Sequence, residues 1–197
     1  MLSRTVSGLI CLMALSLPAA AAPLYYFTSL SGPNESPANA SPGTGTAWVT
    51  IDPVAHTLMV QTSFANLTSG VTASHIHVIN GPGDANTGDT LGPVATTTPT
   101  FTDFPSGVTS GNYAKTFDTL LATTYRAGFV TDAGGLAAAE AALFSGITGG
   151  RAYLNIHTSQ FPNGEIRGFL QVPEPATLLL MGAGIAGLVV MRRRRLI

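Results

Sequence analysis

The segment Arg151–Phe169, RAYLNIHTSQFPNGEIRGF, places the tightest limits on what this chain can fold into. Two stretches of alternating apolar and polar residues flank a turn sequence, which is typical of a β-hairpin. Pro162–Gly164 suits a three-residue loop, in which proline begins a type I turn and glycine takes the left-handed position of a bulge. This loop predicts three pairs across the hairpin: Phe161 with Glu165, His157 with Phe169 and Asn155 with Gln171.

Strand alternation then assigns each side chain of the hairpin to one of two faces. One face is apolar, and we expect it to join the core: Leu154, Ile156, Ile166, Leu170 and Val172. The other face is mostly polar: Tyr153, Asn155, His157, Glu165, Arg167 and Phe169. A one-residue slip would mix the two sets, so the apolar pattern and the turn chemistry favour the same assignment of faces.

The hairpin lies in a region, residues 22–171, where short apolar runs alternate with turn residues, and this predicts a single all-β domain. A domain of about 150 residues is large enough for one hydrophobic core. The expected strands are Leu24–Leu30, Gly45–Ile51, Thr57–Phe64, Val71–Ile79, Val94–Thr100, Asn112–Phe117, Arg151–His157 and Glu165–Val172. The alanine-rich stretch Asp132–Gly146 interrupts the pattern. We expect it to form one short helical insertion over the end of a β-sandwich, with Asp132 as N-cap and Gly146 as the stop.

The N-terminal residues 1–21 have the parts of a secretory signal peptide. Arg4 supplies the positive charge, Val6–Leu17 is the short apolar run, and we expect cleavage after Ala21. The run is shorter than the about 20 residues that a membrane-spanning helix needs. Cys11, the single cysteine of the chain, lies inside this signal. The exported domain then contains no cysteine, which excludes disulfides, cysteine–zinc sites and cysteine nucleophiles.

The C-terminal residues 172–197 have three parts in order. A Pro-Glu-Pro motif comes first and consists of Pro173, Glu174 and Pro175. The apolar run Ala176–Met191 follows it. The basic tail comes last and consists of Arg192, Arg193, Arg194 and Arg195. The run predicts a short membrane helix, because flanking arginines can snorkel and the bilayer can thin around it. The positive-inside rule keeps the arginines in the cytoplasm, so the domain before the helix lies outside.

This C-terminal arrangement resembles the PEP-CTERM sorting signal of Gram-negative bacteria. The resemblance implies handling by the export machinery, transient anchoring in the inner membrane with the N-terminus outside, and processing by an exosortase-type enzyme. It also implies a final place at the cell surface or in the extracellular matrix, near exopolysaccharide or surface proteins, as in biofilm-forming organisms.

The charge of the exported part argues against one class of partner. Residues 23–172 carry four basic and nine acidic side chains, a net charge of −5. The four bases are also scattered: Lys115, Arg126, Arg151 and Arg167. Nucleic-acid binding needs clustered positive charge, so we expect no nucleic-acid partner.

Four stretches together resemble the CHRD domain, first named in chordin and common in bacterial secreted proteins. They are LSGPNESP (Leu30–Pro37), GTGTAWVTID (Gly43–Asp52), HIHV with the following NGP (His75–Pro82), and YLNIHT…FPNGEIRGFL (Tyr153–Leu170). They occur in the order of that family and span nearly all of the domain. The resemblance implies an immunoglobulin-like or superoxide-dismutase-like β-sandwich.

The stretch SHIHV places His75 and His77 two residues apart, so both rings share one face of a strand. With His157 they form a candidate site for a single zinc or copper ion. If Ile76 faces the core, the two rings point to the opposite face. The other register buries the two rings in the core, and the sequence leaves both registers open.

The same histidines also fit a hydrogen-bonded structural cluster with the polar residues of the hairpin, namely Tyr153, Asn155, Glu165 and Arg167. Copper–zinc superoxide dismutases use a His-X-His strand in a β-sandwich, but their dinuclear centre needs more imidazoles and a disulfide. The four histidines of this chain, with His56 in an expected turn, argue against such an enzyme.

We therefore expect a non-enzymatic, exported β-sandwich with a binding or structural role at the cell surface or in the matrix. The alternative is a secreted protein that binds one zinc or copper ion at His75, His77 and His157 and that, with copper, could be redox-active.

Overall fold

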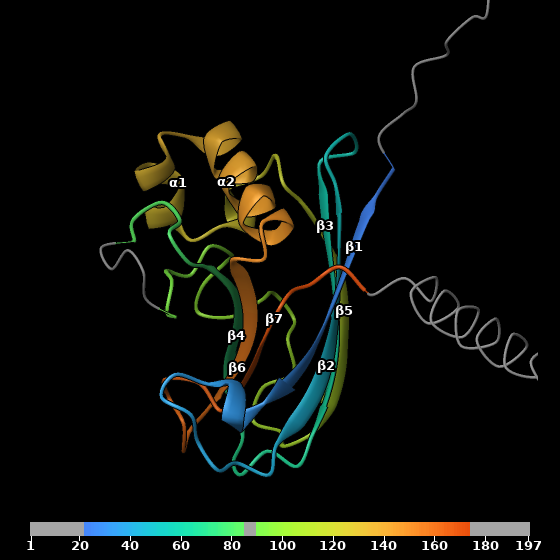
Figure 1. Cartoon of the computed structure of the whole chain (residues 1–197), viewed down its shortest axis with the longest axis vertical. Coiled ribbons are helices and arrows are strands. Elements are labelled where there is room, and N and C mark those ends of the chain that lie inside the picture. Colours follow the sequence, from blue (N-terminus) through green and yellow to red (C-terminus); the bar gives the residue numbers. More distant parts are fainter. Residues whose placement is uncertain (1–21, 85–89, 174–197) are drawn as a thin grey trace, which may run out of the picture.

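A computed structural model describes residues 22–84 and 90–173, with seven strands and two short α-helices (Figure 1). The strands are β1 (Leu24–Ser31), β2 (Thr44–Asp52), β3 (Thr57–Ala65), β4 (Val71–Val78), β5 (Gly111–Asp118), β6 (Ala152–Thr158) and β7 (Ile166–Phe169). The helices are α1 (Ala127–Ala133) and α2 (Leu136–Thr148), with 3-10 turns η1 (Gly32–Asn34) and η2 (Ala122–Thr124). None of the helices in these two ranges is long and apolar enough to cross a membrane.

All seven strands belong to one antiparallel sheet with the order β4-β6-β7-β1-β2-β3-β5. The expectation of a sandwich of two sheets is corrected: one curled sheet forms a half-barrel, with β4, β6 and β7 on one side and the other four strands on the other (Figure 1).

The seam of the curled sheet lies between β7 and β1 and is narrow. Ser31 pairs with Arg167, and a bridge joins Phe27 to Gln171. Gly168 makes this close approach possible, because a methyl group there would overlap the Thr28 side chain and the backbone of Ser29. This contact connects what would otherwise be two sheets.

Apolar residues at alternate positions of the strands form the core on the concave side of the curled sheet. Val49 of β2, Val60 of β3, Ile76 of β4 and Leu154 of β6 are all fully buried in one cluster. Helix α2 lies against β4 and β6 and adds Leu143 to the same cluster. The prediction of one all-β core with a helical cover is thus confirmed in its main layers.

Seven of the eight predicted strands are present, and Val94–Thr100 is the exception. Only isolated bridges form there, such as the one between Val94 and His77. Threonine side chains take other main-chain hydrogen bonds of β4: the Ile76 N–H donates to Thr96 Oγ1 at 2.9 Å, and the Ser74 N–H donates to Thr100 Oγ1 at 3.0 Å. Hydroxyl groups can compete in this way with a main-chain ladder. Pro99 also has no N–H to offer.

The predicted helix Asp132–Gly146 corresponds mainly to α2, which begins at Leu136, and a separate helix, α1, precedes it. Gly134 and Gly135 have φ angles of 89° and 131°, which glycine adopts readily, and they separate α1 from α2. Asp132 therefore lies inside α1 and caps no helix. Gly146 lies inside α2 and allows a close approach to β4, since a Cβ there would be 2.5 Å from a methyl carbon of Val78.

The hairpin keeps its predicted faces but not its predicted pairs. Tyr153 pairs with Phe169 and Asn155 pairs with Arg167, so the connection is longer than three residues. A turn does close from Phe161 to Gly164, where the Gly164 N–H donates to the Phe161 carbonyl at 3.1 Å. The change in pairing is an even number of residues, which leaves each side chain on its predicted face. Two residues outside the strands are exceptions. Val172 lies beyond β7 and is 65% exposed, and the Glu165 carboxylate turns away from the polar face toward Ser41 and Thr158.

Candidate metal centre

Strands β4 and β6 bring the three predicted histidines together. Their antiparallel register sets His75 opposite Asn155, His77 opposite Tyr153 and Ala73 opposite His157. The three rings therefore share the face opposite the fully buried Ile76, and this decides between the two registers that the sequence leaves open.

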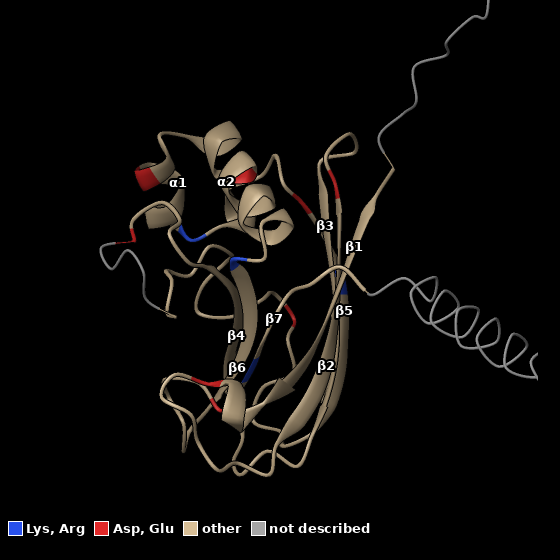
Figure 2. Cartoon of the chain, viewed as in Figure 1, with Lys and Arg blue, Asp and Glu red and all other residues tan. Residues whose placement is uncertain are grey.

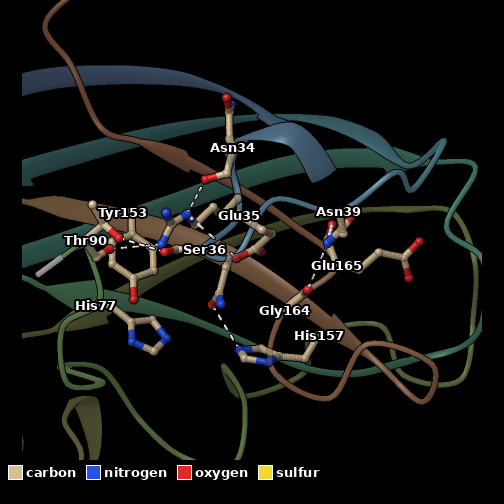
Figure 3. Close-up of polar contacts among 12 residues, drawn as sticks. Asn34, Glu35, Ser36, Asn39, His77, Thr90, Tyr153, His157, Gly164 and Glu165 are labelled. Carbon is tan, nitrogen blue, oxygen red and sulfur yellow. Dashed lines mark hydrogen bonds and ion pairs between the residues drawn. The ribbon is translucent and has the colours of Figure 1, made fainter.

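This face is covered although it points away from the core. His75 is 7% exposed and His77 is 9% exposed, and His157 is half-buried. The chain between β4 and β5 folds over the rings and supplies backbone oxygens to two of them. Figure 3 shows His77 and His157 on the same side of the strands.

Each of the three rings donates one hydrogen bond to a backbone carbonyl. His75 Nε2 donates to Pro99 at 2.5 Å, and His77 Nδ1 donates to Gly92 at 2.8 Å. His157 Nδ1 donates to Pro162 at 2.9 Å. A carbonyl oxygen only accepts, so these nitrogens carry the protons and the other nitrogen of each neutral ring keeps its lone pair.

Two of those lone pairs are buried and have no partner. His75 Nδ1 and His77 Nε2 account for two of the four buried side-chain atoms without a hydrogen bond in the described ranges. The third, His157 Nε2, lies 3.1 Å from the Asn155 side-chain amide, whose NH2 group can be turned toward it. Buried polar atoms are nearly always satisfied, so two orphans on adjacent rings call for an explanation.

The environment keeps the three histidines neutral. Burial lowers the pKa of His75 to about 4 and that of His77 to about 3, against the opposing effect of the carbonyl hydrogen bonds. Burial also lowers the pKa of His157. Neutral imidazole is the form that binds a metal ion.

The spacing of the rings is close to that of a single-ion site. The potential ligand atoms of His75, His77 and His157 all lie within 4.8 Å of one another. Ligands about 2.0–2.1 Å from a tetrahedral zinc ion lie about 3.3 Å apart, so the longest separation would have to shorten on binding. The carbonyl bonds on the far side of each ring are the outer contacts that usually orient metal-bound histidines.

A stack of flat groups supports one wall of this cluster. The Tyr153 ring lies 4.7 Å from the His77 ring at an angle of 7° between the planes. The Arg167 guanidinium lies 4.9 Å from the centre of the same tyrosine ring. The Tyr153 oxygen also accepts a hydrogen bond from the Gly92 N–H at 3.3 Å, so Tyr153 fixes both His77 and the carbonyl partner of that ring.

Arg167 connects the cluster to the loop after β1. Its guanidinium donates to the carbonyls of Asn34 and Thr90 and lies 3.7 Å from the Glu35 carboxylate. Both charged side chains are 4% exposed. Burial raises the pKa of Glu35 to about 7, although Arg167 and the Ser36 N–H oppose that shift.

The structure places Glu165 apart from the histidines, and in Figure 3 its carboxylate points away from them. The carboxylate accepts hydrogen bonds from the hydroxyls of Ser41 and Thr158, both at 2.6 Å, and from the Thr68 N–H at 2.7 Å. Burial acts to raise the pKa of Glu165, but these donors together outweigh it and hold the pKa below its usual range. Glu165 thus ties the loops of Ser41 and Thr68 to the end of β6 and takes no part in the histidine cluster.

The fourth histidine also lies elsewhere. His56 Nδ1 is 3.0 Å from the Glu140 carboxylate of α2, which also accepts a hydrogen bond from Thr119. The candidate site therefore contains three histidines, and no second group of three or more metal-binding side chains occurs in residues 22–84 and 90–173.

Sequence reasoning missed the carbonyl groups of Gly92 and Pro99. They belong to the main chain, and residue type carries no signal for where a carbonyl oxygen will point. The buried partner of Arg167, Glu35, was also missed, because its loop is far from β7 in the sequence. Of the predicted sorting residues, Pro173 ends the described chain, while the rest, from Glu174 to Arg195, and the signal peptide lie outside it.

Comparison with known families gives two matches. The model of the CHRD domain matches residues 26–170, and the model of the PEP-CTERM protein-sorting motif matches residues 171–195. Neither the curated proteins nor the solved structures give a match.

Proposed function

The chain belongs to the CHRD domain family, and from that premise we propose that it is a non-enzymatic surface or matrix module whose domain holds one zinc or copper ion. Its PEP-CTERM motif implies export, processing by an exosortase and sorting to the cell surface. Beyond export and sorting, we propose a role at the surface or in the matrix and a bound metal ion.

One observation carries the metal proposal: His75 Nδ1 and His77 Nε2 are buried lone pairs without a partner. A metal ion would satisfy both at once, with His157 as the third ligand. Three imidazoles suit zinc and copper better than magnesium or calcium, which prefer oxygen ligands. A merely structural cluster would be expected to satisfy these nitrogens with protein donors.

We propose that the domain has no catalytic role because both of its buried glutamates are already held by other contacts. Glu165 is fully engaged by hydroxyl and backbone donors, and Glu35 faces Arg167. Neither carboxylate is hydrogen-bonded to a histidine of the cluster in the described part of the chain. A general base beside a metal-bound water is therefore not supported by the contacts of this site.

The test is metal analysis of the purified protein after reconstitution with zinc or copper. Wild type should hold one ion per chain, and His77→Ala should lose it. His56→Ala is the matched control, because it removes a histidine outside the cluster and should keep the ion. The metal retained also separates a structural ion, zinc, from a redox-active one, copper.

Stability gives a second readout of the same site. Metal at about 1,000 times its dissociation constant should stabilise the folded state by about 4 kcal/mol. Wild type and His56→Ala should show this gain in the free energy of unfolding, and His75→Ala/His77→Ala should not. No bound metal in wild type, together with identical stability of all variants with and without metal, would rule out the site.

A further inference from the structure

The structure fixes the point at which the C-terminal tail leaves the domain. The Phe27 N–H donates to the Gln171 carbonyl at 2.8 Å, and the Gln171 N–H donates to the Phe27 carbonyl at 3.1 Å. The described chain ends two residues later, beside β1 and on the opposite side of the molecule from α1 and α2 (Figure 1). Strand β1 is therefore the strand with which the chain pairs just before the tail begins.

The tail allows only a short distance between this point and a membrane. The apolar run begins at Ala176, five residues after Gln171. Five extended residues span about 17 Å at most. Pro173 and Pro175 lie in this linker, and the headgroup layer itself is about 5–7 Å thick. An anchored domain therefore stays next to the bilayer surface.

The outer face of β1 and β2 near this point carries exposed aromatic residues. Phe27 pairs with Trp48 across the two strands, and their rings lie 4.8 Å apart. Trp48 is 45% exposed and Tyr25 is 58% exposed. A shallow hollow of about 390 Å³ lies beside Trp48, lined also by Gln61 of β3. The backbone of Trp48 is two strand spacings, about 10 Å, from that of Gln171.

This aromatic face differs from the rest of the domain in charge. Strands β1 and β3 contain no charged residue, and β2 contains only Asp52 at its end. Figure 2 shows charged residues mainly on the helices and connecting loops. Residues 23–172 have a net charge of −5, so an uncharged face is the one that anionic lipids repel least. Tryptophan and tyrosine also favour the membrane–water interface.

We infer that the outer face of β1 and β2, with Tyr25, Phe27 and Trp48, docks on the headgroup layer of the bilayer while the tail is anchored. This inference rests on the membrane anchoring of the PEP-CTERM tail. Docking would hold the Pro-Glu-Pro motif at the membrane surface, where the tail enters the bilayer. It makes β1 and β2 a temporary interface that is exposed again once the tail has been processed.

Trp48 is the only tryptophan of the chain, so its fluorescence reports on this face alone. The full chain without its signal peptide is reconstituted into vesicles of phosphatidylethanolamine and phosphatidylglycerol, with lipids brominated at different depths. Bromine near the headgroups should quench the emission strongly, and bromine near the chain ends should quench it weakly. Tyr25→Ser should reduce the quenching without changing the far-UV circular dichroism.

The matched control moves the probe and keeps the tail. Trp48→Phe/Leu120→Trp places the single tryptophan at a 52% exposed position after β5, next to Thr119, whose hydroxyl bonds to α2. Its emission should be quenched much less. Equal quenching at both positions would show a domain without a fixed orientation and would overturn the inference.

Flotation with the vesicles distinguishes anchoring of the tail from docking of the β1 and β2 face. A chain that floats but shows unquenched Trp48 emission has its anchor and no docking, which refutes this inference alone. A chain that does not float lacks the anchor, and both ideas then fail. If Trp48 emission is unchanged by vesicles but responds to a soluble neutral polysaccharide, the face is a glycan site and the inference is wrong.

Discussion

The buried carboxyl of Glu35 leads to a prediction about how the stability of the domain depends on pH. Its carboxyl is 4% exposed, lies 3.7 Å from Arg167, and has one buried oxygen without a hydrogen bond. Burial raises its pKa from 4.5 to about 7 despite the nearby guanidinium. In the folded protein the group is thus protonated over a pH range in which it is ionised in the unfolded chain.

The sign of the effect follows from proton release on unfolding. Between pH 4.5 and 7 the unfolded chain binds fewer protons at Glu35 than the folded one, so raising the pH favours unfolding. The contribution is fully present below pH 4.5 and is lost as the pH rises to about 7. At about 1.4 kcal/mol per pH unit, the loss is about 3 kcal/mol. For a domain of this size that corresponds to roughly 6 to 12 °C in Tm.

The substitution Glu35→Gln isolates this contribution, because glutamine has the same shape and does not ionise. We expect wild type and Glu35→Gln to have similar free energies of unfolding at pH 4.5. At pH 8 the variant should be more stable by up to about 3 kcal/mol. Urea unfolding of the metal-free protein, followed by circular dichroism in steps of pH, measures the difference.

Glu165→Gln is the control with the opposite chemistry. Its carboxylate accepts three hydrogen bonds and has a lowered pKa, so its contribution is present above pH 4.5 and is lost only below it. An amide group turned toward these donors should cost about 1–3 kcal/mol, constant between pH 5 and 8. If the difference between wild type and Glu35→Gln is also constant over that range, or if wild type is the more stable at pH 8, the reasoning about Glu35 is refuted.

Three further substitutions test other parts of the molecule. Gly168→Ala should destabilise by about 3 kcal/mol in urea unfolding, because its methyl group would overlap Thr28 and the backbone at the seam; a loss under 1 kcal/mol would contradict that geometry. Gly134→Ala, with φ of 89° and no atom within 4 Å of the new methyl, should cost only about 1–2 kcal/mol through its left-handed backbone; a larger loss would point to an unseen contact. Glu174→Ala should leave an unprocessed, membrane-retained form on immunoblots of cell fractions, and unchanged processing would argue against sorting through the Pro-Glu-Pro motif.

Much of the strand pattern could be predicted because it depends on local alternation. The faces of the residues within β6 and β7 were predicted correctly even though Asn155 pairs with Arg167 and not with Gln171. Faces depend on whether a shift is odd or even, whereas pairs depend on the full length of the connection. The extra length comes from Glu165, whose carboxylate turns toward Ser41 and Thr68. Those partners are more than 95 residues away, so no local pattern reveals them.

The meeting of the three histidines could be anticipated from their motifs, but their surroundings could not. The His-X-His spacing and the parity of the hairpin place rings on faces, and the pairing of β4 with β6 makes those faces one. The segment Val94–Thr100, which covers the rings, was predicted as a strand because threonine and valine favour strands. Its hydroxyls instead take over hydrogen bonds of the β4 backbone, which frees its carbonyls for the rings.

The Phe27–Gln171 bridge also determines how the domain responds to a mechanical pull. A chain held by its C-terminus receives force at Gln171, and the first contacts to carry that force are the two hydrogen bonds to Phe27. From there the force passes into β1, which pairs with β2 along all eight of its residues. Strand β6 is reached next, because the Leu170 N–H donates to the Ala152 carbonyl at 2.9 Å. Tension on the tail is thus directed first into the broad half of the sheet, before it reaches the strands of the candidate metal centre.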